Sequence, residues 1–272
     1  MSTTSNLPPP RSILLVGGGQ GIGLESTLYL LASSPSSIHL IVFGLDINDQ
    51  LRRHRDTQNR LHLLQGDVTK SADRERAIQL CLDVAGALDC LVYCAGLITP
   101  IQRIENLDLD AVRLTYEVNV FGVMAMCQLA LPHLLRSRRP HAIILSSACD
   151  LSVTYRGWMT YCTTKAALSR FIQLFAHENP ELCVQGVYPR LTDTKMPADV
   201  VAGKYAGIMA EAEIQKFRDF AKDSSTFEPA AWCGEAVARL ASGSQMGGST
   251  GKVLYYEEHV PDLLAKKPRA RL

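Results

Sequence analysis

The sequence predicts one α/β domain, built on a doubly wound parallel sheet of about seven strands with helices on both faces. Short apolar runs rich in β-branched residues alternate with amphipathic stretches along most of the chain. A glycine-rich segment, Gly17 to Gly23, joins the first run to the first amphipathic stretch. Strands that are apolar throughout need cover on both faces, and right-handed crossovers place helices there. The pattern is therefore that of a Rossmann-like domain.

The predicted strands share continuous apolar character and, in chain order, are 12–16, 38–43, 61–65, 90–93, 142–146, 183–187 and 253–256. The predicted helices have apolar residues at helical spacing and are 21–31, 71–84, 120–135, 159–177 and 229–241. Ser71 is a candidate helix cap. The stretch 192–227 is longer than a simple connection and has helical periodicity at 210–221, so it is a candidate lid over the active site.

Length and composition limit the number of domains and the classes of partner that we expect. We expect a disordered arm at 1–11, the domain at 12–258 and a basic tail at 259–272. The 272 residues are 47% apolar with a net charge of +1, which disfavours nucleic acid and anionic membranes as partners. No apolar run approaches the roughly 20 residues of a membrane span. Eight scattered cysteines without a CxxC pair are interpreted as reduced thiols rather than metal ligands.

The glycine-rich segment predicts a dinucleotide site. Gly17, Gly21 and Gly23 permit a tight turn and a close approach of the backbone to a pyrophosphate. The helix that follows offers unpaired N–H groups at its positive end, and Gln20 and Ile22 complete the candidate phosphate loop.

Asp46 indicates which nucleotide is preferred. It follows the second predicted strand, where a carboxylate can accept both ribose hydroxyls of NAD and repel the 2′-phosphate of NADP. Gln20 supplies no positive charge for that phosphate. The alternatives are a surface turn at Asp46, or NADP binding through Arg52, Arg53 or Arg55. We expect NAD, with NADP left open.

Two further pairs follow predicted strands. Asp67 and Val68 end the third strand, where an adenine ring could rest, and Ala95 and Gly96 end the fourth, where small residues let a cofactor pass. A helix-capping aspartate and a turn glycine would explain the same residues without a ligand.

Tyr161 and Lys165 are one helical turn apart and share a face. A phenol titrates near 10, and a neighbouring ammonium, helped by an oxidised nicotinamide, should lower that pKa. The tyrosine could then exchange a proton with a carbonyl or alcohol oxygen. Ser147, just past the fifth strand, could hold that oxygen by a hydrogen bond.

With these residues the chain resembles the short-chain dehydrogenase/reductase family from Ser12 to about Tyr256. The matching stretches are Gly17–Gly23, Gly66–Val68, Ala95–Gly96, Val118–Val120, Ser146–Ser147, Tyr161–Lys165 and Pro189–Thr194. A finer similarity, in 146–149, 157–158 and 254–256, is to its benzil and sepiapterin reductase subgroup.

The resemblance implies further roles. Asn119 would join a proton relay through Lys165, which would also bind the nicotinamide ribose. Pro189, Leu191 and Thr194 would line the nicotinamide. The resemblance also implies a homodimer or homotetramer that closes long helices against each other.

The chain departs from the family pattern in the spacing of Ser147 and Tyr161, about one residue longer than is common, and in the identity of residues at three places. Val16 replaces a threonine that tethers the loop, Tyr93-Cys94 replace an asparagine pair, and Arg190 replaces a glycine. We hypothesise that Arg190 contacts the cofactor phosphates or an anionic substrate group.

The resulting expectation is an enzyme: an NAD(P)-dependent oxidoreductase that interconverts a ketone or aldehyde with its alcohol. Two alternatives stay open, a dinucleotide-sensing regulator without turnover, and a lyase or epimerase that uses the cofactor transiently. Leu151, Tyr155, Trp158 and Met196 are candidates for an apolar substrate pocket or for ordinary core residues.

The chain ends in Ala270-Arg271-Leu272, which resembles the Ser-Lys-Leu peroxisomal address. We expect a peroxisomal protein, the alternative being a solvated basic tail on a cytoplasmic one.

Overall fold

Seven parallel strands form the centre of the fold, in the order β3-β2-β1-β4-β5-β6-β7. The computed structural model describes residues 11–54, 56–222, 227–243 and 249–266. The strands are β1 (Ser12–Val16), β2 (His39–Gly44), β3 (Leu61–Gln65), β4 (Cys90–Tyr93), β5 (His141–Leu145), β6 (Cys183–Tyr188) and β7 (Val253–Tyr255). The order reverses between β1 and β4, which is where ligands bind in open sheets of this kind. The predicted doubly wound sheet is confirmed.

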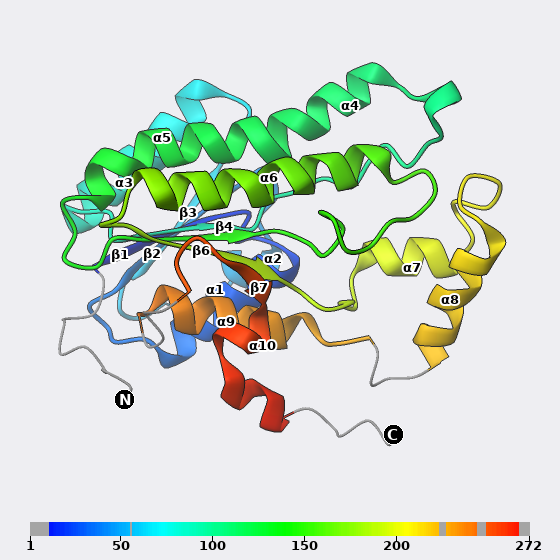
Figure 1. The fold of residues 1–272 in the computed structure, drawn as a ribbon. Helices are drawn as coiled ribbons and strands as arrows, with labels where there is room; N and C mark the ends of the chain where they lie inside the picture. The colour runs from blue at the N-terminus through cyan, green and yellow to red at the C-terminus, as the bar shows by residue number, and fades with distance from the viewer. Residues whose placement is uncertain (1–10, 55, 223–226, 244–248, 267–272) are drawn as a thin grey trace.

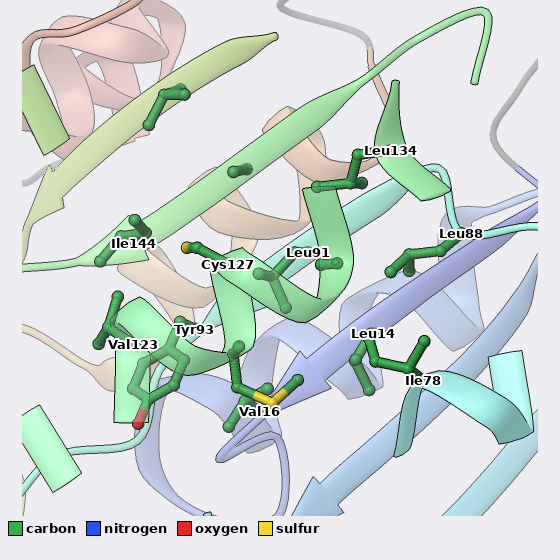
Figure 2. Packing of buried hydrophobic residues seen from close by; sticks show 14 of the residues in the cluster. Leu14, Val16, Ile78, Leu88, Leu91, Tyr93, Val123, Cys127, Leu134 and Ile144 are labelled. Carbon is green, nitrogen blue, oxygen red and sulfur yellow. The ribbon is translucent and has the colours of Figure 1, made fainter. Parts of the chain in front are cut away.

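Helices cover both faces of the sheet (Figure 1). One face carries α3 (Ser71–Ala85), α5 (Gly122–Leu134) and α6 (Met159–Glu178), and the other carries α1 (Gly21–Ser33) and α9 (Ala230–Ala241). Successive residues of β1 enter different cores: Leu14 and Val16 pack under α3 and α5, and Ile13 and Leu15 pack against α1 and α9. Figure 2 shows the first of these cores, with Cys127 and Leu134 of α5 lying over the strands.

The long helix in the middle of the chain begins earlier than the sequence predicts. The predicted start at Val120 is wrong, since α4 (Leu109–Tyr116) and a π-helical turn, η2 (Glu117–Phe121), precede α5 without a break. The Asp108 carboxylate caps α4 by accepting from the backbone N–H groups of Asp110 and Ala111. By length and composition Leu109–Leu134 could cross a membrane, but 44% of its most apolar window is buried, and it packs on the sheet as a core helix.

Smaller differences lie at the ends of other elements. Lys70, not Ser71, occupies the N-cap of α3, and the Ser71 hydroxyl donates to Glu75. Short helices that the sequence did not predict are α2 (Asp49–Arg52), η1 (Ile104–Asn106), α10 (Tyr256–His259) and η3 (Pro261–Lys266). Because Val260 and Leu263 are buried, the packed fold continues beyond residue 258.

The predicted lid contains α7 (Lys195–Val201) and α8 (Glu211–Lys222). Buried residues from both helices form a third apolar cluster with Trp158, at the start of α6. The segment therefore lies beside the amino end of α6, where Tyr161 is located. Residues 1–10 and the Ala270-Arg271-Leu272 terminus lie outside the described residues.

Candidate active site

The predicted site residues gather at one edge of the sheet. Because all seven strands are parallel, the residues that follow them share the carboxyl edge. They are Gly17 after β1, Asp46 after β2, Asp67 after β3, Ala95 after β4, Ser147 after β5 and Pro189 after β6.

The glycine loop is closely packed against its neighbours. Gly17 has a positive φ of 78°, and a Cβ there would lie 2.5 Å from the backbone nitrogen of Ala95. A Cβ on Gly23 would collide with the carbonyl oxygen of Gly17, and one on Gly19 with that of Asp46. These close approaches require glycine, so the loop fits directly against the loops that follow β2 and β4.

Thr27 tethers the loop in place of the hydroxyl that Val16 lacks. Its Oγ1 lies 3.0 Å from the carbonyl oxygen of Gly18 and 2.9 Å from that of Gly23. The Val16 carbonyl accepts from the backbone nitrogens of Cys94 and Ala95. The sequence analysis missed Thr27, although its position four residues after Gly23 on α1 was a usable signal.

The amino end of α1 is suited to bind an anion. Gln20 occupies its N-cap, and within the described chain no side chain caps this helix. The first backbone hydrogen bond of the helix is donated by the Leu24 N–H to the Gln20 carbonyl. The N–H groups of Gly21, Ile22 and Gly23 are thus available to a phosphate, and the tight glycine cradle fits a dinucleotide.

Asp46 is exposed, and its backbone lies against Gly19. The arginines that could have favoured a 2′-phosphate have other partners. Arg52 donates to the Ile47 carbonyl and to Gln65, and Arg53 lies 3.4 Å from Asp49. Arg55 falls outside the described residues.

Asp67 is ordered by its surroundings. Its carboxylate accepts from the backbone and the hydroxyl of Thr69, and its own N–H donates to Asp73 at 2.9 Å. Val68 is buried, and its carbonyl accepts from Arg74. The sequence analysis missed the part played by Asp73, which fixes the loop from the first turn of α3.

Ser147, Tyr161 and Lys165 meet as predicted. The Tyr161 phenol lies beside the Ser147 side chain, which lowers its pKa, and the Lys165 ammonium lies 5.6 Å from the centroid of the Tyr161 ring. Lys165 is 4% exposed, and its Nζ donates to the Leu145 carbonyl at 3.0 Å. Serine, phenol and ammonium thus form one continuous group at the ends of β5 and α6.

In the protein without a nucleotide, burial has the largest effect on the Tyr161 pKa, and the expected lowering with an oxidised nicotinamide bound stays a prediction. Burial raises the pKa of Tyr161, and only the neighbouring Ser147 side chain opposes this rise. Burial also lowers the pKa of Lys165 to about 8. Without a nucleotide, Tyr161 is therefore protonated at neutral pH, as an ordinary phenol is.

Lys165→Met should stabilise the protein at pH 7. The buried ammonium has a pKa of about 8 instead of its ordinary 10.5, so folding is penalised by about 3 kcal/mol below pH 8. The penalty disappears as pH rises from 8 to 10.5, because there the unfolded chain binds the extra proton and stability increases. Urea unfolding of the wild type across this range should show that rise, and the methionine variant should lack it. A rise of equal size in both proteins would contradict this account.

Asn119 lies in the π-helical turn and is 1% exposed. Its side chain accepts from the Leu97 N–H and donates to the Leu97 carbonyl, both at 2.7 Å, and its Nδ2 also lies 3.1 Å from the Thr164 hydroxyl. Gly96 lies between Asn119 and Lys165, the two residues of the proton relay that the resemblance implies. A Cβ there would be 3.4 Å from the Asn119 Oδ1 and 3.8 Å from the Lys165 Nζ.

Tyr93 explains one departure from the family pattern. In the π turn the Gly122 N–H bonds to the Glu117 carbonyl and so leaves the Val118 carbonyl without its usual α-helical donor. The buried Tyr93 hydroxyl donates to that carbonyl at 2.7 Å. Tyr93 thereby supports the turn that presents Asn119, a role that the sequence analysis missed.

The residues after β6 line the same edge. Pro189, Leu191 and Thr194 are half-buried, and Leu191 packs against the cluster that contains Tyr161. Arg190 does not fit its hypothesised role. Its Nε donates to the buried Glu257 at 2.6 Å, and its guanidinium stacks 3.5 Å from the Tyr255 ring centroid. This side chain ties the end of β6 to the end of β7.

Metal chemistry has no support in the described part of the chain, which holds no group of three or more His, Cys, Asp or Glu suited to a metal. All eight cysteines are free thiols.

Known proteins share the sequence pattern and the fold of this chain. The family model described as short chain dehydrogenase matches residues 11–204. The uncharacterized oxidoreductase YIR035C of Saccharomyces cerevisiae is 24% identical over 91% of this chain and 96% of its own. Its crystal structure superposes with a TM-score of 0.85, covering 95% of this chain and all of the other.

Two further relatives have names that state a reaction or a bound cofactor. The S. cerevisiae benzil reductase ((S)-benzoin forming) IRC24 is 26% identical over 80% of this chain and 86% of its own. A 3-oxoacyl-[acyl-carrier protein] reductase from Brucella melitensis, solved in complex with NAD, has the same fold, with a TM-score of 0.75, 23% identity and coverage of 93% and 99%. The family model matches, the fold is shared, and a glycine loop lies beside a serine–tyrosine–lysine group. The chain therefore belongs to the short-chain dehydrogenase/reductase family, near its benzil reductases, and is an oxidoreductase.

Proposed function

We propose that the protein is an NAD-dependent reductase that converts an apolar, aromatic ketone into its alcohol. The observation that carries the proposal is the position of the Tyr161 phenol, beside Ser147 and Lys165 and on the same sheet edge as the glycine loop. A protonated donor beside a hydrogen-bonding hydroxyl is the arrangement that carbonyl reduction requires.

Each residue has a distinct part in the proposed reaction. Ser147 holds the substrate carbonyl oxygen by a hydrogen bond, and Tyr161 gives that oxygen its proton as the carbonyl carbon is reduced. A bound nicotinamide supplies the hydride. Lys165, with a pKa of about 8, can return a proton to the phenolate, and Asn119 fixes the Leu97 backbone beside it.

An apolar wall beside Tyr161 indicates the substrate class. The Trp158 ring lies edge-on to Tyr161 at 6.1 Å, and Tyr155 packs on Trp158 at 4.7 Å and on Phe217 at 5.2 Å. Trp158 and Phe217 are each 1% exposed and form the core beneath the site, so Tyr155, which is partly exposed, is the member of this cluster that could meet a flat, apolar substrate. The similarity to a benzil reductase agrees with this choice. Leu151, the other predicted pocket residue with a described side chain, is 86% exposed and does not belong to this cluster. The Met196 side chain lies outside the part of the chain that the structure describes.

Asp46→Ser should reverse the preference for NAD. Without the carboxylate, the 2′-phosphate of NADP is no longer repelled, and NAD loses a charge-assisted hydrogen bond worth about 1.5–3 kcal/mol. The ratio of kcat/KM for NADH to that for NADPH should fall by roughly tenfold to a hundredfold, which is what those energies correspond to. Asp49→Ser, on the same loop, is the matched control. An unchanged ratio in the Asp46 variant would contradict the role of this carboxylate.

The reductase is tested by following nicotinamide absorbance over a panel of aromatic, aliphatic and sugar carbonyls that includes benzil. We expect NADH oxidation with the aromatic ketones and one alcohol formed per NADH consumed. A dinucleotide-sensing regulator would bind NADH without turnover. A lyase or epimerase would form product with no net absorbance change, so each alternative gives a different result.

The exposed face of the long helices is a candidate interface between copies of this chain. Leu109, Leu114, Phe121 and Met124 are each more than a third exposed along the α4–α5 helix, and Leu174 lies exposed on α6. A second copy would cover these side chains, as the resemblance to an oligomeric family implies. The upper side of Figure 1 shows α6 running beside the continuous helix formed by α4 and α5.

Phe121→Asp should dissociate such an oligomer. A charge on a surface that loses its water on association is strongly unfavourable. We expect light scattering to give a dimer or tetramer mass for the wild type and a monomer mass for the variant. Leu264→Asp, an exposed leucine on η3, should keep the wild-type mass. A monomeric wild type would remove this part of the proposal.

Peroxisomal import through Ala270-Arg271-Leu272 stays a prediction. A fluorescent protein fused ahead of this terminus should collect in peroxisomes, and a diffuse signal would contradict import.

A further inference from the structure

Two cysteines flank the Ser147–Tyr161 pair. Cys149 follows Ser147 by two residues, and Cys162 directly follows Tyr161. Both side chains belong to the apolar cluster at the start of α6, where the two thiols are close enough to shift each other's pKa, and the Cys162 Sγ also lies 3.9 Å from the Val153 carbonyl oxygen. Two sulfurs from different elements therefore meet beside the group proposed to carry out proton transfer.

Cys162 is the more reactive thiol of the two. It lies in the first turn of the 20-residue helix α6, where the helix dipole favours a thiolate. The neighbouring Cys149 thiol and the backbone N–H of Tyr155 both lower its pKa. Cys162 is also partly accessible, whereas Cys149 is 8% exposed.

The other cysteines lack these features. Burial raises the pKa values of the Cys81, Cys94 and Cys127 thiols to about 12 and that of Cys183 to about 11. A reactive, accessible thiol beside a second thiol that can resolve its oxidised form is the arrangement of redox-sensitive cysteine pairs.

We propose that Cys149 and Cys162 form an oxidisable dithiol, which a hydroperoxide such as hydrogen peroxide converts into a disulfide that switches off turnover. The Cys162 thiolate attacks one peroxide oxygen, the O–O bond breaks, and the products are a sulfenic acid and, after protonation, water. The Cys149 thiol then attacks the Cys162 sulfur, the S–O bond breaks, and a second water leaves. In total, two thiols and one hydrogen peroxide give one disulfide and two waters.

The disulfide would act on the neighbouring catalytic group. The backbone N–H of Cys149 donates to the Ser147 hydroxyl at 3.2 Å, so the Cys149 loop positions Ser147. Drawing the two neighbouring sulfurs together to the ~2.05 Å of an S–S bond pulls this loop toward α6. Turnover should fall by about a hundredfold, because a displacement of about 1 Å in a site of this kind can have that effect. The glycine loop carries neither cysteine, so nucleotide affinity should persist.

The test treats the full-length protein with increasing hydrogen peroxide, blocks the remaining thiols and maps the disulfides by mass spectrometry. We expect a Cys149–Cys162 linkage, formed in parallel with the loss of turnover and reversed by dithiothreitol. NADH affinity, measured on the same samples, should stay at its starting value.

Variants separate this pair from the other thiols. Cys162→Ser should keep its activity at the peroxide dose that inactivates the wild type. In Cys149→Ala, which lacks the resolving thiol, excess hydrogen peroxide should oxidise the Cys162 sulfenic acid further to a sulfinic acid, which dithiothreitol does not reduce. Cys183→Ser, a partly exposed thiol on β6, should respond like the wild type.

The proposal is overturned if the wild type loses activity without a Cys149–Cys162 linkage, or if the linkage forms and turnover is unaffected. The mapping is made on unmodified wild type and needs no carbonyl reduction. A failure of the proposed reductase function would therefore leave the disulfide result readable by itself.

Discussion

Tyr161→Phe should lower turnover by about 10²–10⁴-fold, the usual contribution of a positioned acid or base. The change removes only the phenolic hydroxyl. The ring keeps its edge-on contact with Trp158 at 6.1 Å, so the packing of α6 should be unaltered. Steady-state kinetics and NADH titration on the same preparation measure the two properties separately. We expect the kcat to collapse and the nucleotide Kd to stay near that of the wild type.

A second phenol provides the control for that experiment. Tyr205 is buried in the same apolar cluster, and Tyr205→Phe should leave kcat near its wild-type value. If Tyr161→Phe turns over as fast as the Tyr205 variant, Tyr161 is not the proton donor.

Gly17→Ala should abolish nucleotide binding. A residue with a side chain at φ 78° is strained by about 1–2 kcal/mol. In addition, the new Cβ would lie 2.5 Å from the Ala95 nitrogen, so the loops after β1 and β4 must separate. Because the phosphate cradle depends on this contact, we expect the Kd for NADH to rise on the order of a hundredfold, equivalent to about 3 kcal/mol.

Gly86→Ala is the matched control for the backbone strain. Gly86 also has a positive φ, 64°, at the end of α3, but a Cβ there would meet nothing within 4 Å. Urea unfolding should show a loss of stability in both variants, and NADH titration should show a loss of affinity only for Gly17→Ala. Equal affinities would mean that the close approach of Gly17 to Ala95 does not shape the site.

The strands could be predicted closely because they are buried on both faces. The residues of β1 and β4 are all buried, so each strand appears in the sequence as an unbroken apolar run with turn residues after it. Helix α4 was missed for the opposite reason. Its leucines, Leu109 and Leu114, are 58% and 52% exposed, so no apolar stripe indicates a helix packed on a core.

The site could be predicted where the chemistry is local in the chain. A glycine loop between a strand and a helix, and a tyrosine one helical turn before a lysine, are visible without a structure. Contacts between distant segments are not. Glu257, which binds Arg190, is 67 residues away from it, and the Tyr93 hydroxyl reaches a carbonyl 25 residues along the chain.

The effect of burial on the pKa of Tyr161 could not be predicted from the sequence for the same reason. Sequence spacing places an ammonium near the phenol, but the pKa depends first on how deeply the fold buries the ring. The burial that lowers the pKa of Lys165 raises that of Tyr161, and both effects arise from packing between α6 and its neighbours.

The central claim is that the protein transfers a hydride to a carbonyl carbon while Tyr161 protonates the oxygen. The most direct measurement uses NADH carrying deuterium at the transferable position, an aromatic ketone and mass spectrometry of the alcohol formed. We expect one deuterium on the carbinol carbon with wild-type protein and about 10²–10⁴-fold less labelled alcohol in the same time with Tyr161→Phe. Alcohol without deuterium, or equal labelling by the two proteins, would contradict the account.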